Sequence, residues 1–93
     1  MVDTAGTLTG AAGALMDKGA AGVYACCSHP VLSGPALERI QASPIRQVIV
    51  TDTIPLSEEA AATGRFKVLS VAALMGEAII RSVTGDSVTS LFV

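Results

Sequence analysis

The sequence predicts an α/β fold in which helices cover a parallel sheet of at least three strands. Three short apolar runs of strand length alternate with stretches whose apolar residues recur at intervals of three and four, the period of a helix. Hydrophobic residues make up 51% of the 93 residues and charged residues 15%, a composition that favours parallel strands buried on both faces. Because such strands connect through right-handed crossovers, we expect one small α/β domain.

The first helix is expected after a short loop of small and hydroxyl residues. Apolar residues recur at helical spacing from Leu8 to Met16, and Gly19 suits the position just after the last turn. The loop, VDTAGT at positions 2–7, directs the free N–H groups of a helix N-terminus toward solvent, where they bind anions. A plain helix cap made by Asp3 or Thr4 explains the same pattern, so both interpretations stay open.

The middle of the chain predicts two strands with a short helix between them. Residues 22–27 are a continuous apolar run typical of a strand buried on both faces, and residues 47–51 are β-branched and bounded by turn residues. Between them, Ser33 suits a helix N-cap and Pro35 the first turn. The helix should end before Pro44, because the residue preceding proline avoids helical geometry.

The last third predicts a third strand and a final helix. A polar, alanine-rich stretch at residues 57–64 indicates a weak helical turn, and residues 66–70 are the third strand. Ser70 suits the N-cap of the final helix, on which Glu77 and Arg81 are spaced as an i,i+4 ion pair.

Composition argues against several classes of function. A net charge of −2 and three aromatic residues do not suit a nucleic-acid surface, which needs basic and stacking side chains. No apolar run approaches the length of about 20 residues that a membrane span requires, so we expect a cytoplasmic protein without a membrane partner. Cys26 and Cys27 are adjacent and should point to opposite faces of a strand as buried, reduced thiols.

Four segments carry a resemblance to a known family. Residues 2–8, VDTAGTL, resemble the second half of the phosphoribosyl loop of type I phosphoribosyltransferase-fold proteins, D-T-x-G-T, which two acids precede by a few residues. Three further segments indicate a more specific family than the loop does: SHPVLSGPA at 28–36, VTDTIPL at 50–56 and SVTSLF at 87–92. In this order and spacing, they resemble the C-terminal part of the ribose-phosphate diphosphokinases (PRPP synthetases) over essentially the whole chain.

The resemblance implies the three-layer parallel sheet of the type I phosphoribosyltransferase fold, truncated at its N-terminal side. Met1 matches an internal position of the loop motif, so residues 1–93 are expected to be a partial C-terminal phosphoribosyltransferase-like domain. The composition gives an independent reason to expect truncation, because a three-stranded sheet this apolar would leave a strand edge and a helix face uncovered.

The resemblance also implies an activity, the transfer of the pyrophosphoryl group of ATP to ribose 5-phosphate, which makes PRPP for nucleotide biosynthesis. The intact enzyme would be a homo-oligomer that requires Mg²⁺, held mainly by its N-terminal part and by substrate phosphates. No catalytic or metal-binding residue is assigned to this chain, which we expect to be inactive alone. The residues matched to the ribose 5-phosphate loop are Asp3, Thr4, Ala5, Gly6 and Thr7. Those matched to a regulatory phosphate or ADP site are Ser87, Thr89 and Phe92.

Some alternatives remain open. The chain could instead be a non-catalytic subunit that docks on an active PRPP synthetase. His29 and Asp52 follow predicted strands, where ligands gather in α/β sheets. We favour an ordinary loop histidine for His29, while a turn before Pro55 explains Asp52 as well as a site does.

Overall fold

The computed structural model describes the backbone of residues 1–92 and the side chains of residues 1–91. The predicted order of helices and strands is confirmed. The elements are α1 (Gly6–Asp17), β1 (Val23–Cys27), α2 (Ala36–Ala42), β2 (Ile45–Thr51), α3 (Glu58–Ala62), β3 (Phe66–Leu69), α4 (Ala72–Thr84) and the 3₁₀ helix η1 (Thr89–Phe92).

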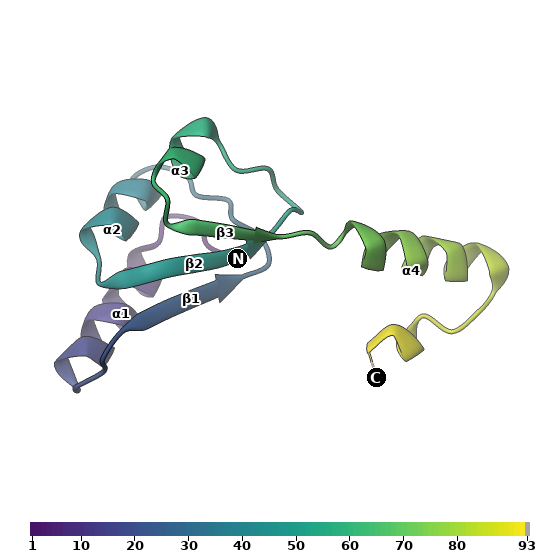
Figure 1. Ribbon diagram of the computed structural model, residues 1–93, viewed down its shortest axis with the longest axis horizontal. Coiled ribbons are helices and arrows are strands. Elements are labelled where there is room, and N and C mark those ends of the chain that lie inside the picture. The colour runs from purple at the N-terminus through teal and green to yellow at the C-terminus, as the bar shows by residue number, and fades with distance from the viewer. Residues whose placement is uncertain (93) are drawn as a thin grey trace.

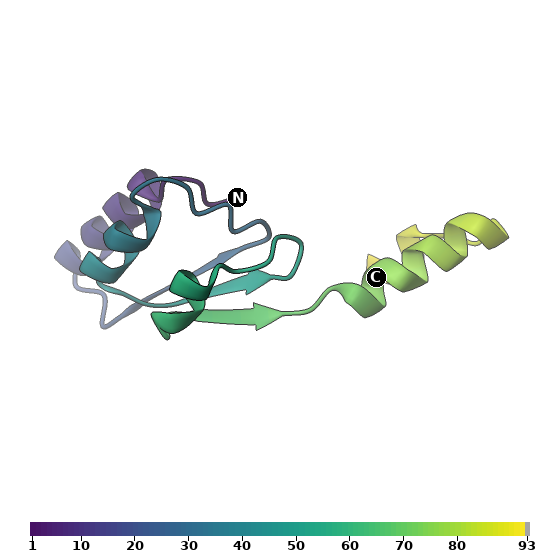
Figure 2. The same cartoon turned by 90° about the horizontal axis from the view of Figure 1, so that it is seen from above.

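The three strands form a parallel sheet in the order β1-β2-β3 (Figure 1). Helices α1 and α2 lie side by side over one face of this sheet (Figure 2). The central strand β2 supplies the largest buried side chains of the sheet, because it is paired on both sides. The core contains Ile40 of α2 together with Ile45, Val48 and Val50 of β2, each at most 1% exposed.

Local signals explain where several elements begin and end. Helix α1 is followed by Gly19 in a left-handed conformation at φ 99°, which L-residues avoid, as predicted. Helix α2 ends before Pro44. The weak turn expected at residues 57–64 is α3, and it begins with a side-chain cap, because the N–H of Ala60 donates to Ser57 Oγ at 3.1 Å.

The second face of the sheet is bare among the described residues, which corrects the predictions of strands buried on both faces and of three layers. Tyr24 is 61% exposed, and Cys26 and Leu69 are also exposed on this face. The expectation that both cysteines are buried is therefore wrong for Cys26. The chain forms two layers because its last helix does not return across the sheet.

Helix α4 instead extends away from the sheet, nearly along the direction of β3 (Figures 1 and 2). Asp52 fixes this departure, since its carboxylate accepts from Ser70 Oγ at 2.6 Å and from the N–H of Val71 at 2.9 Å. We call residues 1–71 the sheet body and residues 72–92 the α4 arm. The radius of gyration is 16.2 Å, against about 12 Å for a compact chain of this length.

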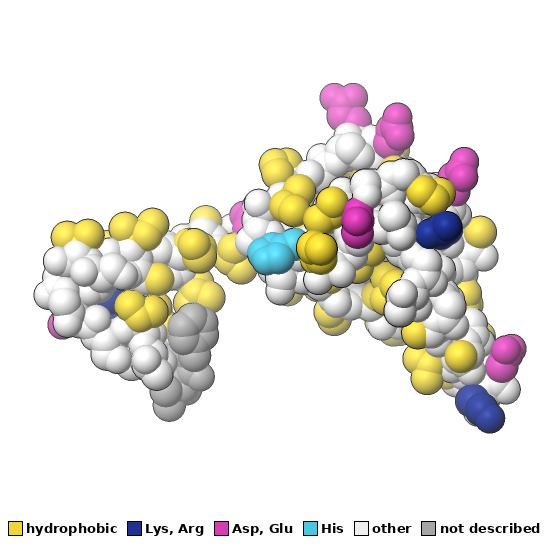
Figure 3. Space-filling view, turned by 180° about the vertical axis from the view of Figure 1, so that it is seen from behind, with side chains coloured by type: hydrophobic (Ala, Val, Ile, Leu, Met, Phe, Trp, Pro, Cys, Tyr) yellow, Lys and Arg dark blue, Asp and Glu magenta, His cyan; other side chains and the backbone are white. Residues whose placement is uncertain are grey.

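The α4 arm exposes a large apolar surface. Its hydrophobic side chains lie at the surface (Figure 3), and the exposed large ones in α4 are Leu74, Met75, Ile79, Ile80 and Val83. The predicted ion pair is confirmed, with Arg81 Nε 3.1 Å from Glu77 Oε1. None of the helices in residues 1–92 is long and apolar enough to cross a membrane.

Candidate functional site

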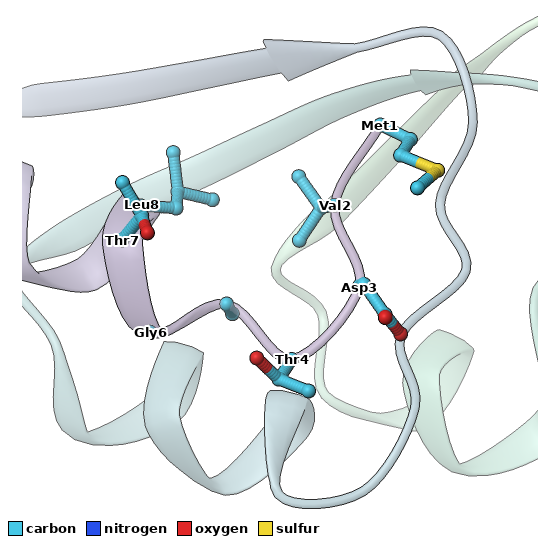
Figure 4. A pocket seen from close by; sticks show the side chains of 8 residues that line it. Met1, Val2, Asp3, Thr4, Gly6, Thr7 and Leu8 are labelled. Carbon is cyan, nitrogen blue, oxygen red and sulfur yellow. The ribbon is translucent and has the colours of Figure 1, made fainter.

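The N-terminal loop lines a depression in the surface of the sheet body. Its volume is about 230 Å³, and Met1, Val2, Asp3, Thr4, Ala5, Gly6, Thr7 and Leu8 line it (Figure 4). All five residues predicted to hold ribose 5-phosphate are therefore in one place. Ala5 is buried beneath the loop, while the other four are exposed to solvent.

Three residues that line the depression have backbone N–H groups outside the hydrogen bonds of α1. The first hydrogen bond of α1 runs from the N–H of Thr9 to the C=O of Ala5 at 3.0 Å. The N–H groups of Gly6, Thr7 and Leu8 therefore precede the intrahelical bonds and have no partner within the helix. The alternative of a plain helix cap made by Asp3 or Thr4 does not hold, because Ala5 occupies the N-cap position without a side-chain hydrogen bond.

Ala5 is in the left-handed conformation, with φ 64° and ψ 12°. This conformation costs roughly 1 kcal/mol or more for a residue with a Cβ, so the surrounding contacts must hold it. On its C-terminal side, Thr9 Oγ1 donates to the C=O of Ala5 at 2.7 Å. On its N-terminal side, the contacts come from the connection between β1 and α2 and from α2 itself.

Ser33 makes the first of these contacts. Its hydroxyl donates to Asp3 Oδ1, and its N–H donates to the C=O of Asp3 at 3.0 Å. The Asp3 side chain accordingly points away from α1, toward the neighbouring coil (Figure 4). This corrects the prediction that Ser33 caps α2, since the N-cap of α2 is Pro35. The hydroxyl supports the loop instead.

Arg39 of α2 makes the second contact. Its Nη1 donates to the C=O of Thr4 at 3.1 Å. The same nitrogen lies 3.0 Å from the point where a Cβ on Gly6 would stand. Gly6 thus leaves room for the guanidinium. Sequence reasoning did not single out Arg39, because no motif connects it to a loop 35 residues earlier.

A hydroxyl cluster joins the carboxyl ends of β1 and β2. Thr51 Oγ1 and Thr53 Oγ1 donate to the C=O of Ser28 at 2.6 and 2.9 Å. Thr53 Oγ1 is 2.7 Å from His29 Nδ1. The tautomer of His29 sets which of these two atoms donates. His29 is held by the cluster as a loop histidine.

Asp52 is the other candidate ligand-binding residue at this edge of the sheet, and its carboxylate is already occupied by hydrogen bonds within the fold. The hydrogen bonds from the Ser70 side chain and the Val71 backbone lower the pKa of its carboxyl below the ordinary value. Both bonds hold the junction between β3 and α4, so Asp52 does not face the loop as a free acid.

The tail residues matched to a regulatory site belong to the α4 arm and are not brought to the loop (Figure 1). Arg81 Nη1 donates to the C=O of Ser87 at 2.9 Å and to Ser90 Oγ. Thr89 begins η1. The side chain of Phe92 lies outside the described residues.

The described residues do not fit a magnesium site by themselves. No three His, Cys, Asp or Glu side chains of the described part of the chain gather closely enough to hold a metal ion. The loop offers one carboxylate, Asp3, and Ser33 already occupies one of its oxygens. Mg²⁺ requires near-octahedral oxygen coordination, which one carboxylate does not provide without further ligands.

The chain is similar in sequence to curated proteins and in fold to a solved structure. The chain is 61% identical over 92 residues to a ribose-phosphate pyrophosphokinase of Bordetella pertussis. The matched region covers 99% of this chain and 30% of that protein. It is 56% identical to one of Oceanobacillus iheyensis, of which it covers 29%. A crystal structure of phosphoribosylpyrophosphate synthetase from Mycobacterium smegmatis superposes with a TM-score of 0.85 at 38% identity, over 91% of this chain and 28% of that one.

These findings confirm the resemblance to the ribose-phosphate diphosphokinases, and the chain spans about 30% of the length of the curated relatives it matches. The family model described as the phosphoribosyl synthetase-associated domain matches residues 1–93. Because that match covers the whole sequence, the chain belongs to the phosphoribosyl synthetase-associated domain family.

Proposed function

We propose that this chain supplies the ribose 5-phosphate-binding loop of an enzyme that transfers the pyrophosphoryl group of ATP to ribose 5-phosphate. The observation that carries the proposal is the depression lined by residues 1–8, where α1 begins with N–H groups free of intrahelical bonds. A phosphate dianion accepts several charge-assisted hydrogen bonds at such a helix terminus. The names of the relatives support the reaction, since they are ribose-phosphate pyrophosphokinases.

Within such an enzyme, the chain is the C-terminal phosphoribosyltransferase-like part, with Met1 inside the loop motif. Two observations support this placement, the coverage of 30% of a relative and the bare second face of the sheet. The remaining part supplies the nucleotide-binding groups and, with the substrate phosphates, holds Mg²⁺. The whole works as a homo-oligomer in the cytoplasm and makes PRPP for nucleotide biosynthesis.

This proposal assigns the loop a binding role. Asp3 orients the loop through Ser33, while Gly6 and Thr7 face the phosphate with their N–H groups. The positive groups that stabilise a transferring phosphoryl group carry most of the catalytic effect in such reactions, and we place them outside this chain. The chain alone is therefore inactive in pyrophosphoryl transfer.

A regulatory phosphate or ADP site at Ser87, Thr89 and Phe92 remains part of the proposal. Its support is Arg81, which already holds the C=O of Ser87 and thus brings a cation to this tail. Binding of ADP to this segment is expected to depend on Arg81.

A second candidate function is a non-catalytic subunit that docks on an active PRPP synthetase. The bare sheet face and the apolar surface of the α4 arm favour it, because exposed surfaces of this kind mark protein contacts. Tight binding to a full-length ribose-phosphate pyrophosphokinase, without any binding of ribose 5-phosphate, would favour this candidate.

Isothermal titration calorimetry with ribose 5-phosphate tests the main proposal. We expect a dissociation constant on the order of 1 mM or tighter for ribose 5-phosphate, and no heat of binding for ribose, which lacks the phosphate. Equal affinity for the two sugars would argue against the proposal. AMP release from ATP and ribose 5-phosphate should be absent, and turnover by this chain would overturn the placement of the catalytic groups elsewhere.

A further inference from the structure

We infer that Arg39 is a positioning residue of the ribose 5-phosphate loop and supplies its positive charge. The inference rests on the proposed function, because it concerns the same site. It adds a residue from α2 that lies 35 positions from the loop residue it binds.

The contacts of Arg39 lie on both sides of Ala5. Before Ala5, the guanidinium donates to the C=O of Thr4 at 3.1 Å. After Ala5, Nη1 and Cζ lie 3.0 and 3.8 Å from the point where a Cβ on Gly6 would stand. Arg39 therefore supports the left-handed turn at Ala5, which directly precedes the residues whose N–H groups have no partner within α1.

The charge of Arg39 complements a phosphate that the loop residues themselves do not neutralise. Asp3, the charged side chain among residues 2–8, is negative. The ion pair found among the described side chains joins Arg81 to Glu77, so Arg39 makes no direct ion pair with a carboxylate there. A guanidinium fixed against the loop lowers the free energy of a bound dianion, and added salt weakens this effect because the site is open.

Arg46 provides a matched control for substitution of Arg39. It also donates to a backbone carbonyl, from Nη2 to the C=O of Ala21 at 2.9 Å. It also packs on a glycine, since Arg46 Nε lies 2.8 Å from the point where a Cβ on Gly22 would stand. Arg46 lies at the start of β2, so its substitution changes the same kind of contact without touching the loop.

The test is a titration of the ¹⁵N-labelled chain with ribose 5-phosphate, followed by amide chemical shifts. We expect Arg39→Gln to weaken binding about fivefold and Arg46→Gln to leave it unchanged. Arg39→Lys should recover part of the affinity, because it keeps the charge but loses the planar fork. The ratio between wild type and Arg39→Gln should fall toward one as salt rises from about 0.05 M to about 1 M, which loss of structure alone would not produce.

The outcomes separate this inference from the proposed function. If the wild type binds ribose 5-phosphate and Arg39→Gln binds it equally well, the role of Arg39 is wrong while the proposed function stands. An equal loss of affinity in Arg46→Gln, or a loss of affinity in Arg39→Gln that added salt does not change, also overturns the role of Arg39. If the wild type does not bind, the proposed function fails and takes the inference with it. If Arg39→Gln loses its dispersed amide spectrum, Arg39→Lys tests the inference instead. Affinity of Arg39→Lys equal to wild type at every salt concentration would overturn the role of Arg39.

Discussion

Ser33 holds Asp3 with both its side chain and its backbone, across a separation of 30 residues. The neighbouring backbone continues the pattern, because the N–H of Leu32 donates to the C=O of Val2 at 3.0 Å. Val2 also forms a parallel bridge with Pro30. The loop that lines the depression is thus set in place by the connection between β1 and α2.

Replacing Ser33 by Ala should weaken ribose 5-phosphate binding about three- to fivefold. The variant loses the hydroxyl bond to the Asp3 carboxylate, a contact worth about 1 kcal/mol at an exposed position, but keeps the backbone bond. Calorimetry on both proteins measures the change. Ser57→Ala is the control, since it removes the cap of α3, costs about 1 kcal/mol of stability and should leave affinity unchanged. Equal losses of affinity would contradict a specific role for Ser33.

Acid should loosen the junction between β3 and α4 through Asp52. The hydrogen bonds from Ser70 and Val71 lower the pKa of this carboxyl in the folded chain. Its stabilising effect is therefore fully present above the ordinary aspartate pKa of about 3.9, and is lost as the pH falls through the lowered folded value. Hydrogen exchange at the Val71 amide should accelerate in that range relative to other amides. The profile of Asp52→Asn should lack this step, and an identical step in both proteins would refute the assignment.

The two adjacent cysteines should react with thiol reagents at different rates. Cys26 is exposed on the bare sheet face, whereas Cys27 is half-buried, and burial raises the pKa of the Cys27 thiol. Because the thiolate is the reactive form, iodoacetamide near neutral pH should modify Cys26 first. Mass spectrometry of Cys26→Ser should show that the fast phase is gone. Faster modification of Cys27 would contradict the described packing of β1.

Two isoleucines distinguish the packed sheet body from the α4 arm. Ile40 is 1% exposed and Ile79 is 60% exposed. Ile40→Ala should lower the free energy of unfolding by about 2–5 kcal/mol. Ile79→Ala should change it by less than about 0.5 kcal/mol in this chain, because the side chain packs on little. Urea unfolding of both variants measures these values, and a large cost at Ile79 would mean that α4 is packed against another surface.

The sequence predicted the order of the elements and most of their ends because these depend on neighbouring residues. Gly19 and Pro44 end helices through backbone geometry that their own side chains impose. The start of β2 depends on pairing instead. It lies at Ile45, opposite Val23 of β1, rather than at Gln47, and no local signal after Pro44 marks that register.

Burial and the supports of the loop could not be predicted in the same way. An apolar strand shows that its side chains are hydrophobic but not which element covers each face, so the exposure of Tyr24 and Cys26 was missed. The loop residues themselves formed a recognisable motif. The contacts of Ser33 and Arg39 with the loop join residues 30 and 35 positions apart, and only folding brings these side chains to it.

The most direct test of phosphate binding by the loop is to map amide shifts of the ¹⁵N-labelled chain during parallel titrations with ribose 5-phosphate and ribose. The proposed function predicts that ribose 5-phosphate gives its largest saturable shifts at the N–H groups of Gly6, Thr7 and Leu8, where α1 begins. Ribose should leave these three amides unchanged. Shifts that are largest at Ser87 and Thr89, or that ribose reproduces at the loop, would contradict it.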